Sequence, residues 1–128
     1  MKKKKLHILV VDDEEIISES IADALEAPHR KIVAAKDGTE ALGMAAKENF
    51  DVIITDHRMP RSGGLELVRK LRDRDYEGKI VVLSGFLSED HIGDYEELDV
   101  DQIVGKPLAS KELREVITGL EEDIDDGI

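Results

Sequence analysis

Five short runs of apolar residues, rich in valine and isoleucine, alternate along the chain with five segments that carry helix-forming patterns. The runs predict strands at about 6–11, 31–35, 51–55, 80–84 and 102–104, and the other segments predict helices at about 14–26, 38–48, 64–74, 88–97 and 111–122. The strands show little alternation of apolar and polar residues, which is typical of strands covered on both faces. This pattern predicts an α/β fold with a mainly parallel sheet.

The fourth predicted helix has the weakest pattern of the five. Its apolar stripe consists of Ile92, Tyr95 and Leu98, and Gly93 costs it about 1 kcal/mol of helix propensity. We therefore expect this helix to be the least rigid element, which suits a part that moves. The acidic residues 121–128 are expected to be a frayed tail with no output domain after it.

Length and composition exclude several classes of protein. At 128 residues the chain is expected to form a single domain, residues 1–128, with one sizeable core. No apolar run is long enough for a transmembrane helix or a signal peptide, so we expect a cytoplasmic protein with no membrane insertion. The absence of cysteine rules out a disulfide scaffold or a thiol nucleophile. A net charge of −12 argues against nucleic acid as a direct ligand.

The charge is unevenly placed along the chain. Residues 1–87 hold 16 acidic and 15 basic residues, whereas residues 88–128 hold 14 acidic and 3 basic residues. We therefore expect the last third of the chain to form a strongly acidic surface. This surface would serve either solubility alone or the docking of a basic partner.

Chemically reactive side chains come directly after four of the predicted strands. They are Asp12-Asp13 after the first strand, Asp56 after the third, Ser84 at the end of the fourth and Lys106 after the fifth. The carboxyl ends of parallel strands line one edge of a sheet, where ligands bind. Clustered carboxylates repel one another unless a hard cation lies between them, and a nearby lysine indicates that an anion arrives as well. The pattern predicts a site for Mg²⁺ and a phosphoryl group.

These residues carry a resemblance to a known family. Asp12-Asp13, Asp56 followed by Met59-Pro60 and Gly64, Ser84, and Lys106-Pro107 occur in the order and spacing of response-regulator receiver domains, from Leu6 to about Leu120. The chain resembles a stand-alone receiver domain of two-component signalling and is similar to the chemotaxis response regulator. The resemblance implies a doubly wound, flavodoxin-like sheet of five parallel strands in the order 2-1-3-4-5, with five helices.

The resemblance also implies roles for these residues. Asp56 would accept a phosphoryl group, Asp13 and Asp56 would bind Mg²⁺ directly, Asp12 would act largely through water, and the backbone carbonyl of Arg58 would be a further ligand. Lys106 and Ser84 would contact the phosphoryl oxygens. The implied donor is a sensor histidine kinase or a histidine phosphotransfer protein. The implied output is a protein target that reads the face around the fourth helix, fifth strand and fifth helix, with the receiver as a monomer or a phosphorylation-dependent dimer. The chain would be no enzyme beyond catalysing its own phosphorylation and dephosphorylation.

Some positions depart from the family pattern. The family usually has an aromatic residue three positions before the lysine, and here that residue is Ile103; Phe86 and Tyr95 are the nearby aromatic candidates. His57 has no partner at metal-ligand spacing, and we expect it to be structural or solvent-facing. Two alternatives therefore stay open: a docking or phosphorelay module with weak phosphorylation-driven switching, and an Asp-nucleophile phosphatase. The phosphatase family has an Asp-x-Asp pair after its first strand, a spacing that Asp12-Asp13 lacks.

Overall fold

The computed structural model describes residues 5–59, 63–85, 87–106 and 110–126, and side-chain burial up to residue 124. Its ten elements alternate along the chain as β1 Leu6–Val11, α1 Glu15–Leu25, β2 Arg30–Ala35, α2 Gly38–Lys47, β3 Val52–Asp56, α3 Gly64–Asp73, β4 Lys79–Ser84, α4 Glu89–Glu97, β5 Gln102–Gly105 and α5 Ser110–Asp126. The five strands begin and end within one residue of their predicted limits.

The five strands form one parallel sheet in the order β2-β1-β3-β4-β5. The α/β fold class and the strand order 2-1-3-4-5 are both confirmed. Each parallel connection runs through a helix, because a parallel pair needs a long crossover. The order reverses direction at β1, so the chain after β1 and the chain after β3 leave the sheet on opposite faces, which opens a crevice between them.

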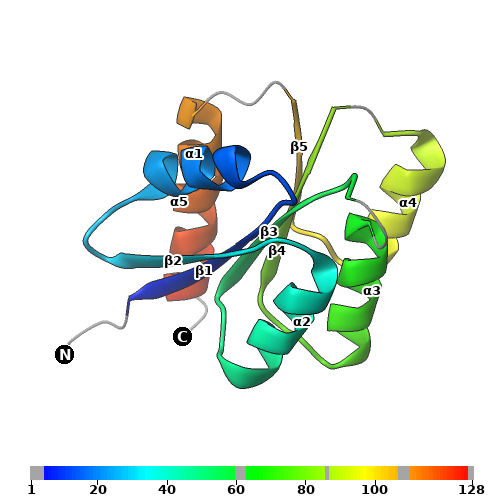
Figure 1. Cartoon of the computed structure of the whole chain (residues 1–128), viewed down its shortest axis with the longest axis horizontal. Helices are drawn as coiled ribbons and strands as arrows, with labels where there is room; N and C mark the ends of the chain where they lie inside the picture. Colours follow the sequence, from blue (N-terminus) through cyan, green and yellow to red (C-terminus); the bar gives the residue numbers. More distant parts are fainter. Residues whose placement is uncertain (1–4, 60–62, 86, 107–109, 127–128) are drawn as a thin grey trace.

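Helices cover both faces of the sheet (Figure 1). On one face, α1 and α5 pack against Ile8 and Val10 of β1, and on the other face α2, α3 and α4 pack against Leu9 and Val11. Successive strand residues point to opposite faces, so every position of a central strand meets a helix. Burying each such side chain contributes about 1.5–3 kcal/mol, which is why β1 and β3 read as continuous apolar runs.

The register of the strands aligns their carboxyl ends. The level pairs are Val11 with Thr55, Asp56 with Leu83, and Ser84 with Gly105. Asp12, Asp56 and Lys106 therefore leave the sheet at neighbouring levels of one edge.

The last helix is longer than predicted. α5 continues to Asp126, so residues 121–126 are helical where a frayed tail was expected. The Arg30 guanidinium pairs with the Glu121 carboxylate, whose second oxygen lies 2.9 Å from Nε2 of His29, and Ile124 packs on the α1–α5 core. These contacts come from a segment about 90 residues away, so local helix propensity carries no sign of them.

The fourth helix is attached by little apolar surface. Tyr95 is its one buried side chain among the described residues, and Ile92 is 38% exposed despite its place in the predicted stripe. Ser88 caps the helix by accepting a hydrogen bond from the His91 N–H at 3.2 Å. The attachment of α4 therefore depends on few side chains.

Candidate functional site

Three carboxylates converge at the carboxyl edge of the sheet. Asp12 and Asp13 follow β1 and Asp56 ends β3, and one oxygen of each lies within 4.8 Å of the other two. Asp12 and Asp56 are buried, with 3% and 8% of their surface exposed, whereas Asp13 is exposed. The cluster is therefore open to solvent on the side of Asp13, and a ligand can reach it there.

Asp12 shows that the cluster suits a cation. Its Oδ1 accepts a hydrogen bond from the Glu14 N–H at 2.8 Å, but its buried Oδ2 has no hydrogen-bond partner among the described residues. Burial raises the pKa of Asp12, against the lowering effect of the Glu14 hydrogen bond, and the neighbouring Asp56 raises it further. An oxygen-only donor set with one unsatisfied buried carboxylate oxygen fits a hard ion such as Mg²⁺, which binds few carboxylates and keeps several waters.

Replacing Asp12 by asparagine is expected to stabilise the metal-free protein by about 0.5–2 kcal/mol, the usual size of one favourable substitution. The amide keeps the acceptor for Glu14 and removes a buried charge. The difference from wild type should shrink as the pH falls from 7 toward 3.8, the ordinary carboxyl value, because the raised pKa lets folded wild type take up its proton first and so gain stability. Urea unfolding at several pH values in EDTA measures it.

Asp37→Asn is the matched control for this prediction. Asp37 caps α2 by accepting a hydrogen bond from the Glu40 N–H at 2.8 Å, so losing its charge at a helix N-terminus should leave stability unchanged or lower. If Asp12→Asn also lowers stability, the charge of Asp12 does not destabilise the metal-free protein, and the prediction is wrong.

Lys106 lies beside the carboxylates. Its Nζ is 3.0 Å from Oδ1 of Asp56, and the side chain is one-third exposed. The Lys106 backbone N–H donates to the Ser84 carbonyl at 2.8 Å, which ties the chain after β5 to the end of β4. The ammonium is therefore placed where it can leave Asp56 for an incoming anion.

The remaining predicted residues frame this cluster. Ser84 is buried at the last position of β4, and Arg58 is exposed in the connection after β3. Gly64 begins α3 against that connection, where a Cβ would lie 2.5 Å from the Asp56 carbonyl oxygen. A side chain at this position would displace the backbone of Asp56. Pro60 and Pro107 lie outside the described residues.

Ile103 occupies the position where the family usually has an aromatic ring. It is half-buried in β5, level with Val82, and packs against the core formed with α2, α3 and α4. An aliphatic side chain at this position has no polar atom, so it cannot change hydrogen-bond partners as a tyrosine hydroxyl can. Of the two aromatic candidates, Phe86 lies outside the described residues.

The other candidate, Tyr95, takes part in a cluster that the sequence reasoning missed. Nδ1 of His57 lies 2.5 Å from the Tyr95 hydroxyl oxygen, and the His57 ring centroid is 4.9 Å from that of His91. His57 is thus partly buried and hydrogen-bonded. A histidine directly after Asp56 was a visible signal, but its partner is 38 residues away and no spacing rule connects them.

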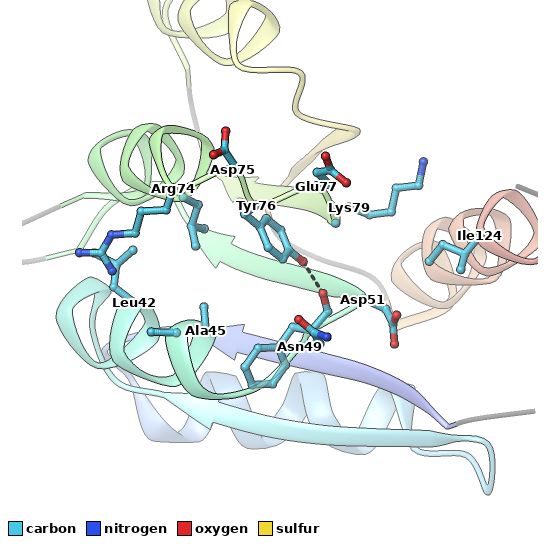
Figure 2. A pocket seen from close by; sticks show the side chains of 14 residues that line it. Leu42, Ala45, Asn49, Asp51, Arg74, Asp75, Tyr76, Glu77, Lys79 and Ile124 are labelled. Carbon is cyan, nitrogen blue, oxygen red and sulfur yellow. Dashed lines mark hydrogen bonds between the residues drawn. The ribbon is translucent and has the colours of Figure 1, made fainter. Parts of the chain in front are cut away.

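A separate hollow lies at the opposite end of the sheet. It has a volume of about 710 Å³ and lies between α2 and α3, lined by Leu42, Asn49 and Tyr76 among others (Figure 2). The Tyr76 hydroxyl donates to the Phe50 carbonyl at 2.8 Å, and both residues line the hollow. The charges around it are mixed, with Asp75 and Glu77 near Arg74 and Lys79, and they form no carboxylate cluster among the described residues.

Comparison with known proteins decides the family. The family model of the response regulator receiver domain matches residues 8–118, which include all of the predicted site residues. The chain belongs to the response regulator receiver family. Members of this family are signalling domains of two-component systems that receive phosphoryl groups from histidine kinases. None of the described helices combines the length and apolar composition needed to cross a membrane.

Relatives by sequence are longer than this receiver. The chain is 34% identical over 101 residues to a response regulator receiver protein of Anaeromyxobacter sp. (strain Fw109-5), and 35% identical over 108 residues to the response regulator MprA of Mycobacterium avium (strain 104). These matches cover 79% and 84% of the chain but 42% and 47% of the relatives. The chain thus spans a little less than half of their length.

Solved structures match over nearly their full length. The chemotaxis protein CheY4 of Vibrio cholerae superposes with a TM-score of 0.84 at 27% identity, over 91% of this chain and 98% of that chain. A CheY-like receiver domain protein of Methanospirillum hungatei JF-1 gives a TM-score of 0.87 at 26% identity, over 97% and 99% of the two chains. The receiver fold is therefore shared almost end to end.

Proposed function

We propose that this receiver accepts a phosphoryl group on Asp56 and signals its presence to a protein partner. The observation that carries the proposal is the convergence of Asp12, Asp13 and Asp56 within 4.8 Å, with the Lys106 ammonium 3.0 Å from Asp56. A carboxylate nucleophile, a site for a hard cation and an ammonium beside them are the parts that phosphoryl transfer requires, since positioning and charge neutralisation dominate its catalysis.

The transfer would form an acyl phosphate on the receiver. A carboxylate oxygen of Asp56 attacks phosphorus, the bond from phosphorus to the donor's imidazole nitrogen breaks, and that nitrogen keeps the electron pair. Mg²⁺, when bound, would neutralise charge on the transferring oxygens. Asp12, Asp13 and Asp56 would hold it with the Arg58 carbonyl, and Lys106 would move from Asp56 to a phosphoryl oxygen. The hydroxyl of Ser84, at the end of β4, would donate a hydrogen bond to a second phosphoryl oxygen. The receiver would catalyse its own phosphorylation and dephosphorylation and no other turnover.

The surface beside the cluster suits a protein donor. Ile16 at the start of α1 is 77% exposed, and a cleft between α1 and α5 is lined by Ile17, Ala24 and Leu113 and also by Lys106. Contiguous exposed apolar surface rimmed by polar residues marks a contact surface, whereas a single exposed apolar side chain does not, so the cleft carries this argument. We place the sensor kinase or the histidine phosphotransfer protein on this side, in the cytoplasm, where phosphoryl donors are made.

The output surface is proposed on α4, β5 and α5. The exposed acidic residues there are Glu89, Asp90, Glu96, Glu97, Asp99, Asp101, Glu112, Glu115, Glu122 and Asp123. Phosphorylation adds about −1.5 to −2 charge and three acceptor oxygens at Asp56, which shifts the population of conformers on this face. A basic protein target would read the shift. Residues 1–128 would act as one receiver domain, as a monomer or a phosphorylation-dependent dimer.

Ile103 favours a second candidate function. Without an aromatic ring three residues before Lys106, phosphorylation can occur with little change at β5. The receiver would then serve as a phosphorelay or docking module in which phosphate is passed on rather than read.

Incubation with acetyl phosphate and Mg²⁺ tests the proposal. Intact-mass measurement should show the gain of one phosphate by wild type, none by Asp56→Asn, and none by wild type in EDTA. The amide of asparagine is too weak a nucleophile to form the acyl phosphate. Phosphate on Asp56→Asn, or none on wild type at saturating Mg²⁺, would overturn the assignment of Asp56.

A further inference from the structure

The backbone of His57 is held firmly between two elements. Its N–H donates to the Leu83 carbonyl of β4 at 2.9 Å, and its carbonyl accepts from the Gly64 N–H at the start of α3 at 2.9 Å. A Cβ on Gly64 would lie 3.0 Å from the His57 Cα, so this approach needs glycine. His57 therefore cannot move without β4 or α3, and it is covalently bonded to Asp56.

The ring of His57 is held by α4. Nδ1 lies 2.5 Å from the Tyr95 hydroxyl, and the two rings meet edge to face at 74° with centroids 5.5 Å apart. The ring of His91, four residues before Tyr95 on the same face of the helix, is tilted against the His57 ring with centroids 4.9 Å apart. Two consecutive turns of α4 thus contact the residue next to Asp56.

Tyr95 also attaches α4 to the core. It is 0% exposed and is the one buried side chain of that helix among the described residues. A buried hydroxyl needs a hydrogen-bond partner, and His57 supplies it. The Arg69–Asp94 pair, at 3.9 Å and largely exposed, adds little to the attachment. Any change in the direction of the His57 ring therefore acts on the one side chain of α4 that is buried among the described residues.

We infer that the hydrogen bond between His57 and Tyr95 couples the state of Asp56 to the placement of α4, with Tyr95 as the positioning residue. The inference rests on the proposed function. The bond restrains α4 in the unphosphorylated receiver, and a phosphoryl group on Asp56, with Ser84 and Lys106 turning toward it, shifts the neighbouring His57 and weakens the bond. This route runs along the α3–α4 side of the sheet and does not need a ring at position 103.

The test uses Tyr95→Phe, which keeps the ring and removes the hydroxyl. Beryllium fluoride with Mg²⁺ serves as a stable phosphoryl analogue on Asp56, and amide hydrogen exchange reports on α4. In wild type the analogue should speed exchange of the α4 amides about fivefold or more, the range of a single allosteric coupling. Tyr95→Phe should already exchange at the faster rate, and the analogue should change it less than twofold. By linkage, the variant should bind the analogue more tightly by the same factor.

Tyr76→Phe is the matched control. It removes the hydroxyl of a partly buried tyrosine, the one that donates to the Phe50 carbonyl at the opposite end of the sheet (Figure 2). The response of α4 to the analogue should persist there at its wild-type size. His57→Ala is the second variant. In a double-mutant cycle, the effects of His57→Ala and Tyr95→Phe on the exchange of the α4 amides should be strongly non-additive, because both remove the same hydrogen bond.

The outcomes separate this inference from the proposed function. Wild type that takes up neither phosphate nor the analogue removes both. Wild type and Tyr95→Phe that are both modified and show the same α4 response overturn the coupling alone. Loss of the α4 response in Tyr76→Phe would also overturn the coupling. It would show that removing any tyrosine hydroxyl loosens the fold enough to abolish the response.

Discussion

Asp13→Asn is expected to slow Mg²⁺-dependent phosphorylation of Asp56 by at least about a hundredfold, the usual cost of losing one electrostatic contact to a transition state. Asp13 is the exposed member of the carboxylate cluster and so the one a hydrated ion meets first. A neutral amide oxygen binds Mg²⁺ more weakly than a carboxylate, because one unit of charge is lost. The initial rate of phosphate gain, measured by intact mass over a range of Mg²⁺ concentrations, gives the loss of rate and the change in Mg²⁺ affinity.

Glu14→Gln is the control for this experiment. Glu14 follows Asp13, is exposed, and makes no side-chain cap to α1, so its replacement removes one charge from the same loop without touching the cluster. Its phosphorylation rate should stay within about threefold of wild type, because exposed charges are screened by salt. Equal rates for Asp13→Asn and wild type at limiting Mg²⁺ would remove Asp13 from the ligand set.

Arg72→Met is expected to lower the free energy of unfolding by about 1–3 kcal/mol, the range for losing partly buried hydrogen bonds to a charged group. The guanidinium donates to four backbone carbonyls: from Nε to Leu98 at 2.8 Å, from Nη1 to Tyr76 at 2.7 Å and Gly78 at 3.1 Å, and from Nη2 to Asp99 at 2.8 Å. It thereby joins the end of α3 to the turn before β4 and to the end of α4. Methionine fills part of the volume but leaves these carbonyls without their donor.

Two companion variants make the result specific. Arg69→Met removes a cation from the same helix whose ion pair is long and exposed, so it should cost less than about 1 kcal/mol. Arg72→Lys keeps the charge but should recover only part of the lost stability. A compact ammonium group cannot donate to all four carbonyls that the planar guanidinium reaches. Urea unfolding of the three variants measures the differences. An Arg72→Met cost no larger than that of Arg69→Met would show that the network contributes no stability.

Much of the site was predictable from sequence because parallel strands share an edge. Asp12, Asp56 and Lys106 each follow a β-branched run, and a sheet covered on both faces leaves only its ends for chemistry. Knowing the strands was enough to expect the three side chains to meet. The strand order came from the family resemblance, because the residue pattern of a strand does not show which other strands lie beside it in the sheet.

Other contacts could not be predicted in this way. The helical extension of α5 depends on Arg30 pairing with Glu121, across 91 residues. The bond between His57 and Tyr95 depends on how far α4 leans toward the connection after β3. Neither involves a spacing in the chain, because both partners sit on elements whose relative placement is set by packing.

The order and types of residues along the chain thus determined the α/β class, the layered core and the edge where the carboxylates and the lysine gather, since periodicity and strand ends are local properties. Only the tertiary structure decided which oxygen of Asp12 stays unpaired, which residue holds His57 and how α4 is attached. Those features depend on distances of a few ångströms between segments far apart in sequence, and side-chain packing between the layers sets such distances.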